Sequence, residues 1–351
     1  MNILMCSAGR RNYLVRWFRQ ALRESGTGGK VIIADADRYA AASAEGDLTI
    51  ELPSIADPNY SKALLETCAN ENVTLLISLN DFELAKWSEI NLAEYRSLGA
   101  TVVTLERETQ TKVEDKYECA KLVSAVGLRA PVTMLASDVI DSVVEPHTLG
   151  TEVVVKHRFG SGSVGLTRCS APDLKLVIER SLEDVRDRWG GRILDRRLAA
   201  ESVVVQQCIH GKEFGLDIVN DLERRYVTTL ARRKISMRSG ETDQAVTSDP
   251  KSFATLGRTL SAALQHQGVL DMDVITDPVG RTWIIDANPR FGGGYPFSHI
   301  AGADLPSCYV AWNLRRSIDP QWLEPKIGIV GSKFQDIARV ACNPETTHAP
   351  A

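Results

Sequence analysis

The sequence predicts a mixed α/β and α+β protein, with a doubly wound parallel sheet first and a longer strand-rich region after it. Strand-like and helix-like segments alternate through the first hundred residues, the order found around parallel sheets. Beyond residue 150, strand-like runs follow one another across short turns. The 351 residues are 44% hydrophobic and 25% charged, which excludes a disordered or collagen-like chain.

The N-terminal elements follow from the spacing of apolar residues. Short apolar runs predict strands at 2–6, 31–34, 75–78 and 101–104. Helical spacing predicts helices at 11–24, 62–70 and 82–94. The first of these helices carries one apolar face, made of Leu14, Trp17, Phe18, Ala21 and Leu22. The short connections favour parallel strands.

The later elements are a helix, a glycine hairpin and several strands. The helix at 115–126 ends at Gly127, and Pro131 follows it. From residue 152 the pattern is strand, glycine loop, strand. Further strands are predicted at 202–208, 213–219, 226–233, 268–276 and 282–286, and helices at 173–186 and 251–267.

Composition excludes several classes of protein. The net charge is −4, so the overall balance indicates no nucleic-acid partner. The seven cysteines are scattered without a CxxC spacing, which indicates a reduced protein without a zinc or disulfide framework. No apolar run approaches the roughly 20 residues of a membrane-spanning helix. We therefore expect a cytoplasmic protein without a membrane partner.

Two glycine-containing loops are candidates for binding phosphate. The loop at 6–11 joins a strand to a helix, but it lacks GxGxxG, which argues against a nicotinamide cofactor. It is either a substrate or anion contact, or a tight turn with Arg10 and Arg11 in solvent. The loop at 160–165 follows Lys156, which lies inside an apolar strand and is costly to bury unless it meets an anion. This combination suits nucleotide phosphates.

The segment 270–294 holds the strongest candidate site. Asp273 and Asp286 lie on neighbouring predicted strands across a tight turn, and Asn288 is two residues beyond Asp286. Side chains two apart share a face of a strand, so these oxygens can converge to hold magnesium. Arg290 follows, placed to stabilise a transferring phosphoryl group. Upstream, the break between the strands at 203–219 resembles a hinge that can bind adenine, with Glu213 near a ribose.

The ordered set of these residues resembles the ATP-grasp superfamily, and most of all its stand-alone members similar to the carbamoyl-phosphate synthetase large chain. The resemblance implies an ATP-grasp fold preceded by a Rossmann-like (pre-ATP-grasp) domain at 1–105. It further implies a central segment at 106–145, a lid that carries the glycine loop at 146–210, and a metal-binding subdomain at 211–345. One departure is Asp286, where the family usually has glutamate.

The resemblance also implies roles for individual residues. ATP would be bound by Lys116, Lys156, Gly160, Ser161, Gly162, Ser163, Gln206, Gln207, Ile209 and Glu213. Two Mg²⁺ ions, with Mn²⁺ as a substitute, would be held by Asp273, Asp286 and Asn288. Arg290 would steady an acyl phosphate. A homodimer is one assembly that such relatives form.

The resemblance also implies a ligase that activates a carboxylate as an acyl phosphate and joins it to an amine. Lys234 and Arg238, with Arg233, would clamp a carboxylate or phosphate, unless 231–247 is a solvated loop. Glu241 would receive an amine. The segment 291–299 would be a mobile loop that either shapes the acceptor pocket or only lets backbone pass closely. Asn80, Asp81 and Glu83 would contact a polar substrate, unless Asn80 or Asp81 caps a helix instead. We expect His157 to pack structurally and Cys208 to line the pocket.

Two alternatives remain open at this stage. One is phosphorylation of a one-carbon acid, as in carbamoyl-phosphate synthesis. The other is a regulatory protein that binds ATP without turnover.

Overall fold

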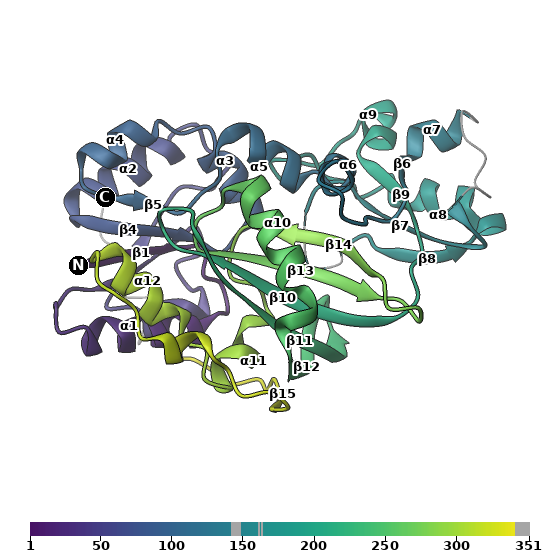
Figure 1. Cartoon of the computed structure of the whole chain (residues 1–351). Helices are drawn as coiled ribbons and strands as arrows, with labels where there is room; N and C mark the ends of the chain where they lie inside the picture. The colour runs from purple at the N-terminus through teal and green to yellow at the C-terminus, as the bar shows by residue number, and fades with distance from the viewer. Residues whose placement is uncertain (142–148, 161, 163, 341–351) are drawn as a thin grey trace.

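The computed structural model describes residues 1–141, 149–160, 162 and 164–340 and contains three β-sheets. Figure 1 shows the central six-stranded sheet between the N-terminal sheet and a smaller four-stranded sheet. Ser161 and Ser163, expected in the ATP site, lie outside the described residues. Among the helices that are described, none combines the length and the apolar character needed to cross a membrane.

The N-terminal sheet is parallel, as the sequence predicts, with strand order β3-β2-β1-β4-β5. Its strands are β1 (Asn2–Cys6), β2 (Val31–Asp35), β3 (Leu48–Glu51), β4 (Val73–Ser78) and β5 (Thr101–Val102). Its helices are α1 (Asn12–Glu24), α2 (Tyr60–Asn70), α3 (Asp81–Trp87) and α4 (Leu92–Ser97), with the 3-10 turn η1 (Ala41–Glu45). Alternate residues of β1 enter different cores, because successive side chains point to opposite faces.

The four-stranded sheet is antiparallel, in the order β6-β9-β7-β8. Its strands are β6 (Thr133–Leu135), β7 (Glu152–His157), β8 (Thr167–Ser170) and β9 (Val203–Gln207). The helices around it are α7 (Ala136–Ile140), α8 (Leu174–Ser181) and α9 (Arg196–Glu201), with η3 (Ala171–Asp173). Helices α5 (Arg107–Glu114) and α6 (Lys116–Ala125) precede this sheet in the chain.

The six-stranded antiparallel sheet, in the order β14-β13-β10-β11-β12-β15, is apolar on one face and charged on the other. Its strands are β10 (Lys212–Asn220), β11 (Tyr226–Arg238), β12 (Glu241–Ser248), β13 (Val269–Thr276), β14 (Thr282–Asn288) and β15 (Val330–Ser332). The remaining helices are α10 (Ala254–Leu264), α11 (Tyr295–Ile300) and α12 (Leu305–Asn313), with η4 (Pro250–Phe253) and η5 (Pro320–Leu323). The apolar face packs on α10, which leaves the charged face for the site.

One hydrophobic core joins the N-terminal sheet to the central part of the molecule. Phe18 of α1 contacts the rings of Phe291 and Tyr309 at centroid distances of 5.9 and 5.8 Å. This interior contact therefore fixes the N-terminal sheet beside the segment that contains Arg290.

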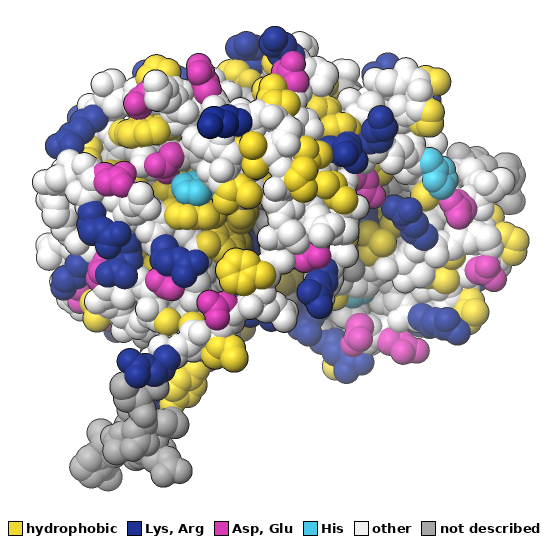
Figure 2. Space-filling view, turned by 90° about the horizontal axis from the view of Figure 1, so that it is seen from below, with side chains coloured by type: hydrophobic (Ala, Val, Ile, Leu, Met, Phe, Trp, Pro, Cys, Tyr) yellow, Lys and Arg dark blue, Asp and Glu magenta, His cyan; other side chains and the backbone are white. Residues whose placement is uncertain are grey.

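On the outer surface seen from below, Figure 2 shows Lys and Arg side chains interspersed with Asp and Glu, and hydrophobic side chains gathered near the centre.

Several expected boundaries were wrong. The predicted helix 82–94 is two helices, α3 and α4, and Asn91 caps the second by accepting from the Ala93 N–H. Most of 231–247 is not a loop, because β11 and β12 pair through it. The segment 291–299 is not wholly a loop either, since α11 begins at Tyr295. The predicted helix 173–186 ends in the structure at Ser181.

Candidate ATP and magnesium site

Strand register brings the predicted metal ligands together. Asp273 on β13 lies directly opposite Asp286 on β14, and Asp271 lies opposite Asn288. Directly opposed residues of antiparallel strands present their side chains on the same face of the sheet. The Asn288 amide nitrogen donates to Asp286 Oδ2 at 3.4 Å, which leaves the amide oxygen for a metal ion. The set of two carboxylates and one amide oxygen fits Mg²⁺.

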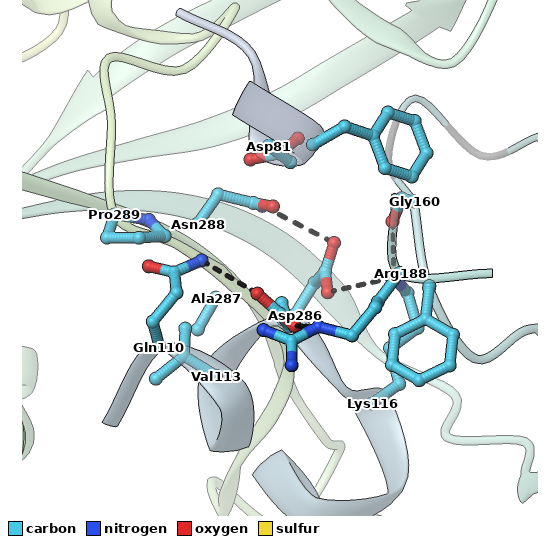
Figure 3. A pocket seen from close by; sticks show the side chains of 13 residues that line it. Asp81, Gln110, Val113, Lys116, Gly160, Arg188, Asp286, Ala287, Asn288 and Pro289 are labelled. Carbon is cyan, nitrogen blue, oxygen red and sulfur yellow. Dashed lines mark hydrogen bonds and ion pairs between the residues drawn. The ribbon is translucent and has the colours of Figure 1, made fainter. Parts of the chain in front are cut away.

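Two cavities lie beside Asp286. They enclose about 380 and 250 Å³ of empty space, part of it open to solvent, and both are lined by Lys116 and Asp286. Figure 3 shows Asp286, Asn288, Lys116 and Gly160 around the larger one. Gln206 lines the smaller cavity together with apolar side chains of α6 and β14. Both cavities thus have mixed walls, and the larger one has more charged side chains among them.

Lys116 is held at the site by its neighbours. Asp115 caps α6 by accepting from the N–H groups of Tyr117 and Glu118, and it also forms a bidentate ion pair with Arg158 at 2.8 and 2.6 Å. The Lys116 ammonium donates to the Gly160 carbonyl at 2.5 Å and lies 3.7 Å from Asp286 Oδ1. Its position therefore depends on both the glycine loop and β14.

Lys156 is a buried cation, 4% exposed, on β7. Burial lowers the pKa of its ammonium to about 8, although the nearby Asp286 carboxylate acts in the opposite direction. In the described part of the chain, its ammonium donates to the Ile285 carbonyl at 3.3 Å. An ammonium has three N–H donors, so two remain for an incoming anion. A phosphate group would satisfy this cation.

The glycine loop lies against the tip of the β11–β12 hairpin. A Cβ at Gly240 would lie 1.8 Å from the Gly162 carbonyl oxygen, and Gly240 has φ +78°. Glycine is therefore required there by both space and backbone conformation. A Cβ at Gly160 would lie 3.5 Å from the ring of Phe82, a residue of α3. Gly162 therefore lies close to the central sheet, and Gly160, which lines the larger cavity, lies close to the N-terminal part.

Lys234 and Glu241 are occupied by ion pairs of their own. Lys234 is 2.7 Å from Asp273 Oδ1, so it pairs with a predicted metal ligand. Lys333 lies 2.8 Å from Glu241. Partial burial acts to raise the pKa of that carboxyl, but the cations of Lys333, Arg11 and Arg290 together lower it. Arg238 is exposed at the end of β11.

The remaining predicted nucleotide ligands lie around β9 and β10. Gln206 donates through its side-chain amide to the Thr133 hydroxyl at 2.8 Å, and the Gln207 N–H donates to the Val132 carbonyl at 2.8 Å. Ile209, two residues further along the chain, is half-buried. Glu213, at the start of β10, pairs with Arg168 at 3.5 Å. These contacts order the segment that the sequence predicts as an adenine hinge.

The three polar residues predicted near the end of β4 have different roles in the structure. Asn80 caps α3, accepting from the N–H groups of Phe82 and Glu83. Glu83 is buried, and it accepts a hydrogen bond at 2.6 Å from Tyr60 and another from Ser78. Burial raises the pKa of Glu83 to about 7. Asp81, in contrast, contacts the site, because it pairs with Arg290.

Sequence reasoning missed a buried charged group beneath the glycines at 292–294. Arg232, 1% exposed, lies 2.5 Å from Asp217 Oδ2 and 2.9 Å from Asp271 Oδ1. Burial raises the pKa of Asp271 to about 7, although the Arg232 cation acts in the opposite direction. The signal was present, because Asp217 interrupts an apolar strand and Asp271 is two residues from Asp273. Gln110 and Arg188, which line the larger cavity, had no comparable signal.

Arg11 and His157 have structural partners. Arg11 Nη1 donates to the carbonyls of Leu79 and Phe291 at 3.0 and 3.1 Å, so the interpretation of Arg11 as a solvated side chain was wrong. His157 is buried, and a Cβ at Gly165 would lie 2.4 Å from its Nε2. This close approach matches the expected packing role.

Comparisons with known protein families match two segments of the chain. Residues 3–103 match a family model described as the PylC-like N-terminal domain, and residues 199–331 match one described as ATP-grasp in the biosynthetic pathway with Ter operon. No match was found among curated protein sequences.

Solved structures resemble the whole fold. The biotin carboxylase domain of Hydrogenobacter thermophilus 2-oxoglutarate carboxylase has a TM-score of 0.68 at 13% identity, over 90% of this chain and 70% of that one. Campylobacter jejuni biotin carboxylase has 0.67 at 15% identity, over 91% and 72%. Staphylococcus aureus N5-carboxyaminoimidazole synthetase has 0.66 at 13% identity, over 91% and 78%. The family model over residues 199–331 and this shared fold, together with the opposed carboxylates, the lysines and the glycine hairpin, support placing the chain in the ATP-grasp superfamily.

Proposed function

We propose that this chain is an ATP-dependent ligase that phosphorylates a substrate carboxylate and joins the resulting acyl group to an amine, releasing ADP and phosphate. The observation that carries the proposal is the meeting of two lysines with opposed carboxylates at one site. Lys116 lies 3.7 Å from Asp286, Lys156 is buried beside the same strand, and Asp273 lies opposite Asp286. Cations for phosphate and oxygen ligands for a divalent ion are therefore adjacent.

ATP is the proposed nucleotide substrate. Lys116 and Lys156 would neutralise its phosphates, and Gly160 to Ser163 would close over them. Gln206, Gln207 and Ile209 would bind adenine, and Glu213 would bind ribose after releasing Arg168. Two solved relatives are described with ADP, one of them as the magnesium salt, which supports this choice of nucleotide.

Asp273, Asp286 and Asn288 would hold Mg²⁺. Bound Mg²⁺ would neutralise charge on the transferring phosphoryl group. In the structure Asp273 pairs with Lys234, and Asp286 lies near Lys116. We propose that both lysines leave these carboxylates when a divalent ion and nucleotide enter. Lys234 would then reach the substrate acid, with Arg238 at the rim.

Arg290 would bind the acid and its phosphorylated form. Burial acts to lower the pKa of its guanidinium, but the adjacent Asp81 carboxylate more than compensates, so the net pKa is raised and the charge is fixed. A fixed guanidinium positioned before the reaction stabilises developing negative charge without reorganisation. The protein thus contributes orientation and charge, and no covalent nucleophile is required.

A second candidate is a one-carbon acid as the phosphorylated substrate. The Hydrogenobacter thermophilus domain is described in complex with bicarbonate as well as MgADP. Because the two chains share a fold at 13% identity, the observation favours bicarbonate as one acid to test.

The test is ADP release from Mg-ATP in the presence of pooled carboxylates and pooled amines, with bicarbonate assayed separately. We expect release that requires both an acid and an amine and that disappears in Lys156→Ala and Asp286→Ala. Lys175→Ala, at an exposed position of α8, is the matched control and should keep full activity. ATP binding without stimulation by any acid would support a regulatory protein and contradict the ligase.

A further inference from the structure

Three metal-binding side chains meet at the outer end of the four-stranded sheet, in a cluster formed by Glu152, Cys208 and His210. Their ligand atoms all lie within 4.8 Å of one another. His210 Nε2 is 3.0 Å from Glu152 Oε2. The cluster is separate from the carboxylates at which we place Mg²⁺, and the proposed ligase reaction does not use these side chains.

The fold explains why these residues meet. Val153 on β7 pairs with Gln207 on β9, so the next residue outward on each strand, Glu152 and Cys208, is also adjacent. His210 follows Cys208 by two residues, and in an extended chain such residues share a side. One ligand comes from the start of β7 and the other two from the segment after β9, so no sequence spacing indicates the cluster. This is why the cysteine pattern predicts no zinc site.

We propose that Glu152, Cys208 and His210 bind one Zn²⁺ ion. Thiolate, imidazole and carboxylate are the three side-chain ligands that zinc uses in proteins. With three protein ligands the fourth tetrahedral position is left for water, as in open zinc sites. The side chains of Glu152 and His210 are 50% and 67% exposed, so an ion can reach them from solvent. A hard oxygen-preferring ion such as Mg²⁺ would not select the sulfur and nitrogen ligands.

The surrounding charges are compatible with a cation there. Arg168 is the positive side chain whose field reaches Cys208, and it is engaged by Glu213 at 3.5 Å. Two carboxylates, Glu152 and Glu213, therefore accompany this guanidinium. Bound zinc would link the start of β7 to the segment after β9 and would stabilise the folded sheet, because it binds the folded form in preference.

The test uses the full chain, reduced and freed of metal with a chelator, and titrates it with Co²⁺ and then Zn²⁺ in the absence of nucleotide. We expect one equivalent of Co²⁺ to give the near-ultraviolet charge-transfer band of a cobalt–thiolate bond, and Zn²⁺ to displace it. Cys208→Ser should abolish the band and weaken Zn²⁺ binding by roughly 100-fold or more. Cys169→Ser is the matched control, a partly exposed cysteine on β8 of the same sheet.

Different results would overturn the proposal. A thiolate band that survives in Cys208→Ser, or that disappears in Cys169→Ser, would place the metal elsewhere. His210→Ala should also weaken Zn²⁺ binding by at least tenfold, and unchanged affinity would exclude this ligand set. Absence of any Co²⁺ or Zn²⁺ binding in the reduced protein would contradict the site outright. None of these measurements requires ligase activity, so failure of the proposed function would leave the zinc result interpretable.

Discussion

Arg290 and Asp81 form a bidentate ion pair that joins the central sheet region to the N-terminal domain. Arg290 Nε lies 2.7 Å from Asp81 Oδ1, and Nη2 lies 2.6 Å from Oδ2. The two side chains are 6% and 14% exposed and 209 residues apart in the chain. Asp81 opens helix α3 immediately after the cap Asn80. The N-terminal domain thus fixes the orientation of the guanidinium that we propose for the substrate acid.

We predict that Asp81→Asn destabilises the protein and lowers its turnover. Removing one partner of a buried ion pair leaves the other charge uncompensated, at a cost of about 3 kcal/mol in the free energy of unfolding. Urea unfolding measures the change. Glu66→Gln, in the exposed pair with Lys62, should cost less than about 0.5 kcal/mol. Equal effects of the two substitutions would show that the Asp81 contact does not join the domains.

ATP binding should weaken as the pH rises through about 8. Burial holds the pKa of Lys156 near that value, so the ammonium that attracts phosphate is lost on the alkaline side. Bound phosphate favours the charged form, so the midpoint in the complex lies at higher pH. Lys156→Met should bind ATP roughly 10–100-fold more weakly and without this pH dependence. Fluorescence titration with an ATP analogue measures both, and a pH dependence that persists in the variant would assign it to another group.

Lys234→Met should tighten the binding of Mg²⁺. The Lys234 ammonium is 2.7 Å from Asp273 and competes with a divalent ion for that carboxylate. Since Asp273 is partly exposed, we expect a gain of only about 1 kcal/mol, close to fivefold in affinity. Calorimetric titration of Mg²⁺ in the presence of ADP tests this. Arg233→Met, at the exposed neighbouring position, should change nothing, and weaker Mg²⁺ binding in Lys234→Met would contradict competition.

Adjacent glycines should differ sharply in their tolerance of alanine. A Cβ at Gly294 would lie 2.1 Å from Arg232 Nε, and that guanidinium is held between two buried aspartates. We expect Gly294→Ala to lower the free energy of unfolding by about 1–3 kcal/mol, because the buried group cannot move aside. At Gly293 the nearest atoms are 3.1 Å away and belong to Glu241, an exposed side chain. Thermal unfolding of Gly293→Ala should therefore stay close to wild type, and equal losses would refute the packing argument.

Sequence periodicity was sufficient to predict a helix or strand where one face of that element is buried. Helix α1 lies where the apolar face of Leu14, Phe18 and Leu22 predicts it, and the buried strands of the N-terminal sheet follow their apolar runs. It failed for short or polar elements. Strand β3 has no fully buried residue, and α5 buries only Gln110 and Val113, so neither carries a strong apolar signal.

The sequence by itself determined which candidate site residues occur along the chain and in what order. A lysine inside an apolar strand, a glycine loop, and two acids on neighbouring strands with an asparagine two residues beyond the second are local patterns, and local backbone geometry fixes which way such side chains point. The tertiary structure alone decided the pairings of Asp81 with Arg290 and Lys234 with Asp273, and the meeting of Glu152, Cys208 and His210. These contacts join residues from different elements. Their distances depend on how sheets and helices pack, which no periodicity in one segment can specify.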